Sequence, residues 1–514
     1  MTKPLVALFL VLSSSAFAQD PGGSPWVAID DAVCAGLKIQ DFAADVGAPV
    51  MVHLSERVPE STNLPAYCRV TATIAPKNSV EIRMPISGWQ GRLLMAGCGG
   101  LCGSIQMART DDALARRYAV AHTDMGHAEE DMSFADDPAL LRDFAHRATH
   151  VATKLLKATA RVYYSRAHDY AYFRGCSTGG RQGLTAALMY PEDYDGIIAG
   201  APASGPAVPN IVWALKANTR ADGSSILDAP AIATLHRAVL GACDMDDGVK
   251  DGIVGDPENC TFDPASIVCG NAAKGRCLTP EQAAAAKAIY GGVVSVGGKK
   301  FASRGFLPGG ELGWLRGLVR TDKPAGFEGI ARNYLRRFTE PNGPKTLAEL
   351  DFAKHVVHLT PVDALPDFGS EGKRLAMFES SGGKLLLYHS WADDSLTTAT
   401  AVDVYAAHEK AFGRDNLDPF FRLFVIPGMF HCRGGEGPDA VDFLSAMESW
   451  VEKGKAPDRL IAYKPHERPP MNSEYRFPLP RDQIVFSRPV FAYPATAKYT
   501  GSGDVNDASN WVKK

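Results

Sequence analysis

The sequence predicts an α/β protein in which a parallel β-sheet carries helices on both faces and is interrupted by one large insertion. Between residues 80 and 200, short apolar runs alternate with helix-like stretches, and the same alternation returns after residue 372. This alternation is typical of a parallel sheet covered on both sides. The composition of the 514-residue chain, 46% hydrophobic and 22% charged, excludes disordered, collagen-like and coiled-coil proteins.

The expected strands and helices follow from short apolar runs and from longer helix-like stretches, respectively. In the first half we expect strands at residues 92–96, 118–121, 170–173 and 196–200, and helices over 143–164 and 182–189. In the second half we expect strands at 384–389 and 421–426, and helices over 397–412 and 439–453.

The stretch between the two halves differs in character. Residues 203–372 contain four cysteines, an Asp/Gly cluster and many prolines and glycines, with little strand periodicity. Insertion of one domain into another is tolerated at surface loops. We therefore expect one core domain formed by residues 19–202 and 373–514, with residues 203–372 as an inserted lid domain.

The N-terminus is typical of an exported protein. Lys3 precedes an apolar stretch at residues 5–12, and an A-x-A cleavage pattern follows at 16–18. Residues 1–18 are therefore interpreted as a signal peptide, a buried N-terminal helix being the alternative. We expect a periplasmic or secreted protein, in a compartment that allows disulfides.

Two classes of partner are not expected. No other stretch approaches the roughly 18 apolar residues of a membrane span, so no membrane segment is predicted. The 54 basic and 58 acidic residues nearly balance, which argues against a nucleic-acid partner. The sequence says nothing about oligomeric state.

A candidate nucleophile lies in the pattern G-x-S-x-G at residues 175–179. Ser177 follows an apolar run and precedes a helix-like stretch, where a sharp strand-to-helix turn would expose its hydroxyl. Glycines suit such a turn, and the backbone N–H of Thr178 would face a developing oxyanion. The alternative is a structural glycine turn.

A serine nucleophile needs an acid and then a histidine later in the chain. Asp393 directly follows residues 388–392 at the end of the expected strand at 384–389, and His431 lies in the loop after the strand at 421–426. Asp394 is the weaker acid candidate because it is farther from the strand end. The alternative for His431 is a capped or core histidine.

Cysteines adjoin both catalytic candidates. Cys176 precedes Ser177, and Cys432 follows His431. A Cys176–Cys432 disulfide would tie the two catalytic loops together and restrict the distance over which a proton is transferred. The pairing of these two motifs supports a serine hydrolase.

These motifs resemble the tannase and feruloyl esterase family, which includes the mono(2-hydroxyethyl) terephthalate hydrolases. The resemblance rests on residues 175–181, the Asp393 turn and residues 428–432, and it extends from Cys34 to residues 498–504. It implies an α/β-hydrolase core with a lid. It also implies a catalytic triad, whose members are Ser177, Asp393 and His431.

The resemblance further implies that the oxyanion hole uses the backbone N–H groups of Thr178 and Gly100. Gly100 lies in a Gly/Cys-rich stretch after an early expected strand, where an α/β-hydrolase keeps its second oxyanion donor. A plain glycine turn is the alternative for this stretch.

A dense Asp/Gly loop at residues 243–253, closed by Cys260, suits a hard cation with oxygen ligands. An acidic solvated loop is the alternative. Family members are similar here and bind calcium in the lid, which implies a structural Ca²⁺ site. The ligands implied are the carboxylates of Asp244, Asp247 and Asp251 and the backbone oxygens of Val249 and Ile253.

The resemblance also implies four cystine pairs. They are Cys34–Cys68, Cys176–Cys432, Cys243–Cys260 and Cys269–Cys277. Cys98 and Cys102 are left over and bracket the proposed oxyanion loop, so we predict that they form a fifth disulfide. A metal-binding pair or two free thiols are the alternatives.

The predicted activity is that of a serine carboxylesterase, in which Ser177 attacks an ester carbonyl and forms an acyl-enzyme. The family suggests a small-molecule aromatic ester as the partner, with a galloyl or feruloyl group or as a phthalate-type monoester. The alternatives are a carboxylesterase of non-aromatic substrates and a calcium-dependent, non-catalytic binding module on the same fold.

Several lid residues are candidates for contacting this substrate. Aromatic rings for stacking and arginines for a free carboxylate are the two kinds sought, although an arginine is by default a solvated surface residue. The candidates are Trp314, Phe327 and Tyr334 for stacking and Arg316, Arg320 and Arg332 for a carboxylate. Leu396, just after the Asp393 turn, stands where family members carry an aromatic residue.

Overall fold

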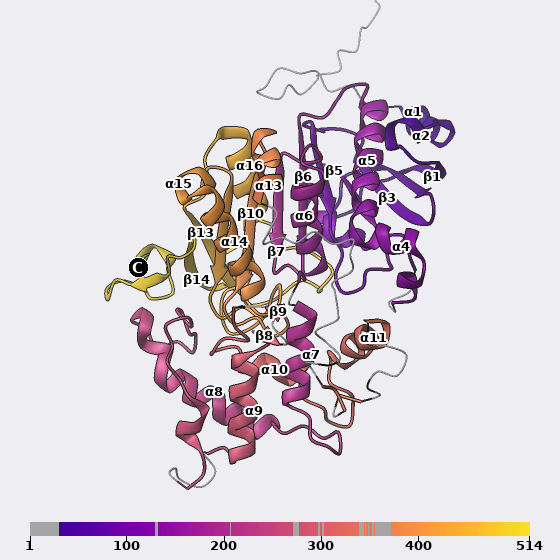
Figure 1. Ribbon diagram of the computed structural model, residues 1–514. Helices are drawn as coiled ribbons and strands as arrows, with labels where there is room; N and C mark the ends of the chain where they lie inside the picture. Colours follow the sequence, from indigo (N-terminus) through magenta and orange to yellow (C-terminus); the bar gives the residue numbers. More distant parts are fainter. Residues whose placement is uncertain are drawn as a thin grey trace, which may run out of the picture.

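The structure is a computed structural model built around one large mixed sheet (Figure 1). It describes residues 30–128, 132–205, 207–270, 277–293, 295–296, 299–300, 303–338, 344, 346–347, 349–351, 354 and 372–514. The predicted signal peptide at residues 1–18 lies outside the described residues.

Among the described residues, nine strands form the main sheet, in the order β1-β2-β3-β5-β4-β6-β7-β10-β11. The strands from β5 to β11 run parallel, whereas β1, β2 and β3 pair antiparallel at one edge. Their bounds are β1 (Val50–Val58), β2 (Tyr67–Ile74), β3 (Asn78–Pro85), β4 (Arg92–Ala96), β5 (Ala119–Thr123), β6 (Tyr170–Cys176), β7 (Gly196–Gly200), β10 (Lys384–Ser390) and β11 (Phe421–Ile426).

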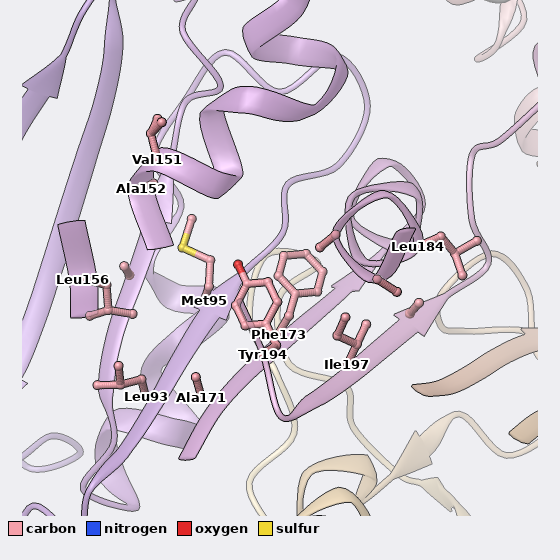
Figure 2. Close-up of a cluster of buried hydrophobic side chains, with 14 of the residues drawn as sticks. Leu93, Met95, Val151, Ala152, Leu156, Ala171, Phe173, Leu184, Tyr194 and Ile197 are labelled. Atoms are coloured by element: carbon pink, nitrogen blue, oxygen red, sulfur yellow. The ribbon is translucent and has the colours of Figure 1, made fainter. Parts of the chain in front are cut away.

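The six strands expected from apolar runs are confirmed as β4, β5, β6, β7, β10 and β11. They read as continuous apolar runs because both faces of this part of the sheet are covered. In β4, the side chains of Leu93 and Met95 join one hydrophobic cluster, whereas Leu94 joins the cluster on the opposite face. The first cluster fills the space between the sheet and helices α5 and α6, where Leu93, Met95 and Leu156 are drawn (Figure 2).

Helices cover both faces of the sheet, with α5, α6, α13 and α14 on one face and α16 on the other. The helices of the core are α1 (Asp31–Gly36), α2 (Ala43–Val46), α3 (Asp111–Ala115), α4 (Pro138–Arg142), α5 (Ala148–Tyr164), α6 (Thr178–Met189), α13 (Gly372–Ser380), α14 (Ala399–Phe412), α15 (Arg414–Leu417) and α16 (Phe443–Lys453). None of the described helices has the length and apolar character that a membrane span needs.

Three expected helices begin differently in the structure. The helix expected over 182–189 is α6, which already begins at Thr178. The helix expected over 143–164 begins with a π-helical turn at Asp143–Arg147 before α5. The helix expected from residue 439 is preceded by the short strand β12 (Ala440–Val441) and begins only at Phe443, because the side chain of Asp442 caps its first turn.

The antiparallel strands at the N-terminal edge were not expected from the sequence. The burial of β1 alternates between exposed and half-buried residues, so its sequence lacks an apolar run. A second sheet near the C-terminus has β13 (Arg459–Pro465) between β12 and β14 (Ile484–Phe491). A separate antiparallel pair consists of β15 (Ala497–Tyr499) and β16 (Trp511–Lys513). These elements depend on pairing with distant partners, which local patterns do not reveal.

The inserted region lies at one end of the sheet and has its own hydrophobic cluster (Figure 1). Trp314 and Leu235 belong to this cluster, and Leu396 of the core packs into it as well. The described helices of the lid are α7 (Ala207–Ala217), α8 (Ala229–Cys243), α9 (Pro280–Gly291), α10 (Glu311–Gly317) and α11 (Glu328–Phe338), with the two-residue strands β8 (Ser295–Val296) and β9 (Lys299–Lys300).

Candidate active site

Ser177 occupies a strained turn between β6 and α6. Its φ of 64° and ψ of −121° lie in a region that residues other than glycine rarely adopt. A Cβ atom on Gly175 would lie 2.7 Å from the backbone of Gly179, and one on Gly180 would lie 2.0 Å from the carbonyl oxygen of Gly200. The turn therefore needs glycine at these positions, and its strain exposes the serine at the end of the strand.

His431 and Asp393 form a hydrogen-bonded pair beside this turn. The Nδ1 atom of His431 lies 2.9 Å from Oδ2 of Asp393, whose side chain is fully buried. The other carboxylate oxygen accepts hydrogen bonds from the backbone N–H groups of Ser395 (2.9 Å) and Leu396 (2.8 Å). These bonds hold the carboxylate in one orientation and direct it toward the imidazole.

The pair also shifts the pKa values of its members. Burial raises the pKa of Asp393, but the charge and hydrogen bond of His431 outweigh burial and hold the pKa below its ordinary value. Burial likewise lowers the pKa of His431, and the attraction of Asp393 more than reverses this, so the pKa lies above its ordinary value. This arrangement would let Asp393 stabilise an imidazolium, as a triad acid does.

A disulfide joins the loop that carries Ser177 to the loop that carries His431. Cys176 and Cys432 are bonded, with Cα atoms 6.1 Å apart, although 256 residues separate them in the sequence. Ser177 and His431 both line one cavity. The structure therefore brings the three sequence-predicted triad residues together.

The loop after β4 lies against the N-terminus of α6. The hydroxyl of Thr178 donates a hydrogen bond to the carbonyl oxygen of Gly100 at 2.5 Å, and Gly100 has a φ of 59°. A disulfide between Cys98 and Cys102 closes this loop, and the side chain of Gln182 accepts a hydrogen bond from the N–H of Cys98. The predicted oxyanion residues are therefore neighbours, at the positive end of a helix.

The remaining predicted disulfides are also present. They are Cys34–Cys68, Cys243–Cys260 and Cys269–Cys277. Each closes a loop of 34 residues or fewer, within the core or within the lid. Only the Cys176–Cys432 bond joins parts that are distant in sequence.

The cavity between the core and the lid has a volume of about 290 Å³. Apart from Ser177, Thr178 and His431, most of its described lining is apolar or small. These further lining residues are Gly100, Leu101, Met132, Phe144, Arg181, Ala203, Ser204, Gly205, Ala207, Val208, Ile211, Phe327, Ile330, Ser395 and Leu396. A site of this kind suits an organic molecule with a large apolar part.

Comparison with known proteins places the chain among esterases. The family model described as tannase and feruloyl esterase matches residues 63–313 and 347–513, which is most of the chain. The chain belongs to the tannase and feruloyl esterase family. Like other members of this family, the protein is a carboxylic ester hydrolase.

Two curated relatives illustrate the family's range. A mono(2-hydroxyethyl) terephthalate hydrolase from Piscinibacter sakaiensis is 30% identical, over 87% of this chain and 85% of the relative. A probable feruloyl esterase B-2 from Aspergillus terreus is 29% identical, over 95% of this chain and 97% of the relative. The alignments span nearly the whole of each protein, so the lid is included in the similarity.

Solved structures support the α/β-hydrolase fold. The crystal structure of an esterase from Aspergillus oryzae matches with a TM-score of 0.81 and 26% identity, over 94% of this chain and all of that one. That of feruloyl esterase B from the same species matches with a TM-score of 0.80 and 24% identity, over the same shares. The predicted α/β-hydrolase core with an inserted lid is therefore confirmed.

The residues predicted to contact the substrate separate into two groups. Phe327 and Leu396 line the cavity, and their contact with a substrate stays a prediction. Trp314 does not line it: the indole is 1% exposed within the lid cluster, between Tyr290 and Phe306. Trp314 is thus a core residue of the lid, and its role in stacking on the substrate was wrongly predicted.

The predicted arginines are engaged elsewhere. Arg320 and Arg332 both form ion pairs with the carboxylate of Glu328, and neither is part of the described lining. Arg316 forms a bidentate ion pair with Asp394. The predicted role of these arginines in binding a substrate carboxylate stays a prediction, and the described lining of the cavity gives it no support. The side chain of Tyr334 lies outside the described residues.

Several lining residues were missed by the sequence analysis. Met132 and Phe144 approach from the core, and Val208, Ile211 and Ile330 approach from the lid. They come from segments far apart in the chain, and each is an ordinary apolar residue within its own segment. No sequence signal distinguishes them from core residues of the fold.

The predicted calcium loop follows α8 in the lid. Asp244 accepts hydrogen bonds from the N–H groups of Asp251 and Gly252, and Asp247 accepts one from that of Val249. The carboxylate of Asp251 pairs with Arg488 at 2.7 Å. As these side chains stand, no group of three or more His, Cys, Asp and Glu residues in the described part of the chain is arranged to hold a metal ion.

Proposed function

We propose that this member of the family is an exported serine esterase, which hydrolyses esters of aromatic acids through an acyl-enzyme on Ser177. The observation that carries the proposal is the shared cavity. Ser177 and His431 both line it, and Asp393 binds the far side of the His431 ring. The names of the relatives, a terephthalate monoester hydrolase and feruloyl esterases, support an aromatic acyl group.

In the proposed mechanism, Oγ of Ser177 attacks the ester carbonyl carbon while His431 accepts the hydroxyl proton. The carbonyl electron pair moves to oxygen, and the N–H groups of Thr178 and Gly100 stabilise the resulting oxyanion. Collapse of this intermediate breaks the ester C–O bond, and His431 returns the proton to the leaving alcohol. Water then attacks the acyl-enzyme with His431 again as base, and the free acid and Ser177 are regenerated.

The wall of the cavity supports a neutral aromatic acyl group. Phe327 and Leu396 supply apolar surface, and Phe144 adds a ring on the core side. Among the described lining residues, Arg181 is the single arginine or lysine, and its guanidinium donates hydrogen bonds to the carbonyl oxygens of Ala145 and Phe144. Because these donors are engaged, a feruloyl or galloyl ester fits this wall better than an acyl group with a free carboxylate.

A hydrolysis panel tests this proposal. Purified protein would be assayed with methyl ferulate, methyl gallate and mono(2-hydroxyethyl) terephthalate, beside Ser177→Ala. We expect the two methyl esters to be hydrolysed fastest, and the variant to lose activity by about 10⁴-fold or more. A fluorophosphonate should label the wild type and not the variant. A folded wild type that is neither active nor labelled would refute the proposal.

We propose in addition that the Asp/Gly loop binds a structural Ca²⁺. The chemistry of the donor set supports this ion: Asp244, Asp247 and Asp251 would supply carboxylates, and Val249 and Ile253 would supply backbone oxygens, all within a short loop tied by a disulfide. Calcium should raise the melting temperature of protein treated with EGTA, whereas magnesium should not. An unchanged melting temperature at millimolar calcium would exclude the site.

We also propose export with cleavage before Gln19. The A-x-A pattern and the five disulfides support this. Mass spectrometry of the protein from a periplasmic fraction and from the medium should find a chain that begins at residue 19. An intact N-terminus in the cytosolic fraction would contradict it.

A further inference from the structure

Helix α10 connects the interior of the lid to the turn that carries the triad acid. Its first residue, Glu311, is fully buried. The carboxylate of Glu311 lies 2.7 Å from Nδ1 of His236 and accepts hydrogen bonds from the Tyr290 hydroxyl (2.6 Å) and the Gly309 N–H (2.7 Å). This buried network fixes the helix to two other lid helices, α8 and α9.

The opposite side of α10 rests directly on the Asp393–Asp394 turn. A Cβ atom on Gly310 would lie 2.8 Å from the carbonyl oxygen of Ala392, and one on Gly313 would lie 2.3 Å from Cβ of Asp394. Real Cβ atoms do not approach so closely, so only glycine lets the helix backbone reach the turn. The lid and the catalytic turn are therefore in backbone contact here.

Arg316 extends this contact by one helical turn. Its Nη2 lies 2.8 Å and 2.7 Å from the two carboxylate oxygens of Asp394, and its Nε lies 3.1 Å from Oδ2. The Oδ1 atom of Asp394 in turn accepts a hydrogen bond from the backbone N–H of His431 at 3.1 Å. Asp393 binds the ring of His431, so adjacent acids hold the ring and the backbone of the same histidine.

The two adjacent acids, Asp393 and Asp394, need a cation nearby because both are buried. The side chain of Asp394 is completely buried, next to the equally buried Asp393. Burial and the charge of Asp393 raise the pKa of Asp394, whereas Arg316 opposes this rise. In the described part of the chain, the other titratable groups facing the turn are His431 and the buried His389, whose Nδ1 lies 3.7 Å from Oδ2 of Asp393. Arg316 is thus the compensating charge for the second acid.

We propose that Arg316 is a positioning residue for the esterase reaction: through Asp394 it holds the backbone of His431, and with it the imidazole, in line with Ser177. It is not part of the described cavity lining, and its side chain is 52% exposed behind the turn. The lid therefore contributes to the acid–base geometry as well as to substrate contact. This inference rests on the proposed serine mechanism.

Steady-state kinetics with methyl ferulate test the role of Arg316. Arg316→Met should lower kcat by about 10- to 100-fold with little change in KM, because a small misplacement of the base slows the chemical step. Arg316→Lys should recover part of kcat, since it keeps the charge but loses the bidentate geometry. The matched control is Arg220→Met, which removes another lid arginine whose partner is Glu281 and should leave kcat and KM unchanged.

A double-mutant cycle then tests the route through Asp394. If Arg316 acts through this acid, Arg316→Met combined with Asp394→Asn should lose no more activity than the worse single variant. Additive losses would overturn the inference. Melting temperatures identify any variant that does not fold; if Arg316→Met is unfolded, Arg316→Gln replaces it in the same comparison with Arg316→Lys.

Other outcomes are equally decisive. An unchanged kcat in Arg316→Met would refute a positioning role. A raised KM with an unchanged kcat would instead show that Arg316 binds substrate directly, which also refutes it. Failure of the serine mechanism is distinguishable, because then the wild type itself would neither hydrolyse methyl ferulate nor be labelled at Ser177 by a fluorophosphonate.

Discussion

The sheet domain and the lid contribute to the same cavity in different ways. In the sheet domain, Ser177, Asp393 and His431 each follow the C-terminal end of a strand, after β6, β10 and β11 respectively. In the lid, the residues at the cavity come from helices and loops packed around a separate hydrophobic cluster. Strand ends of a parallel sheet hold reacting groups at nearly fixed positions, whereas the lid supplies a wall whose shape depends on its own packing.

The disulfides show the same contrast. In the sheet domain, Cys176–Cys432 joins the two loops that carry the nucleophile and the base. In the lid, Cys243–Cys260 and Cys269–Cys277 close loops of 17 and 8 residues. We conclude that Cys176–Cys432 constrains the geometry of the candidate catalytic loops. The lid disulfides constrain local loops, as Cys34–Cys68 and Cys98–Cys102 do in the core. Four experiments can break or sharpen this division.

The largest effect is expected for the triad acid. Asp393→Asn should lower kcat by about 10⁴-fold without unfolding the protein, because the amide cannot stabilise the imidazolium or orient the ring as a carboxylate does. Activity on methyl ferulate and the melting temperature would be measured together. Asp222→Asn, at an exposed lid turn, is the control and should behave as wild type. A larger loss in Asp394→Asn than in Asp393→Asn would reverse their assigned roles.

The pH dependence of kcat/KM should also reveal Asp393, through its effect on the pKa of His431. His431 must be neutral to act as base, so activity falls about tenfold per pH unit below its pKa. Because Asp393 raises this pKa above the ordinary histidine value, activity should be lost at a higher pH than an unperturbed histidine would give. In Asp393→Asn the acidic side of the pH–activity profile should move to lower pH. The pH dependence of the rate of fluorophosphonate labelling would measure this shift. An unchanged pH profile would show that Asp393 does not raise the pKa of His431.

The disulfides allow a direct comparison of the two regions. Replacing Cys176 and Cys432 together by serine should lower the free energy of unfolding by about 2–4 kcal/mol and also reduce kcat. The same change at Cys269 and Cys277 should destabilise the protein less, because the loop is short, and leave kcat unchanged. Chemical denaturation and assays on methyl ferulate would measure both. An equal loss of kcat in the two variants would contradict the division.

The smallest effect is expected in the lid wall. Phe327→Ala should raise KM for methyl ferulate by roughly 5- to 30-fold, with kcat little changed, because apolar contact with the substrate is lost. Trp314→Phe, inside the lid cluster, should instead lower the melting temperature and leave KM unchanged. The opposite pattern would mean that Trp314, and not Phe327, contacts the ring.

Much of the site was predictable from the sequence because its chemistry is encoded locally. The G-x-S-x-G pattern around Ser177 follows an apolar run, and Asp393 and His431 follow two others. A buried parallel strand needs a continuous apolar run, which the sequence reveals. The residue that follows such a run lies at the C-terminal end of the sheet, so its position can be predicted from its place in the chain. Cysteines next to the nucleophile and the base made their pairing predictable as well.

The antiparallel edge of the sheet could not be predicted in this way. Strands β1, β2 and β3 have one or both faces only partly buried, and their pairing depends on partners outside their own sequence. The same holds for the C-terminal hairpins. Strand formation at an edge is a property of the neighbours as much as of the strand.

The sequence by itself predicted the candidate nucleophile, acid and base, because each follows the end of an apolar strand within a few residues, and the structure brings them together. The cystine pairs implied by the family resemblance are present as well. Only the tertiary structure decided which lid residues reach the cavity. Trp314 and Phe327 are both aromatic and lie close together in the chain, yet one is enclosed by the lid cluster and the other faces the substrate cavity. Arg316 forms its ion pair with Asp394 because helix α10, which carries Arg316, packs on the Asp394 turn. Such contacts depend on how separate segments pack, which no local pattern specifies.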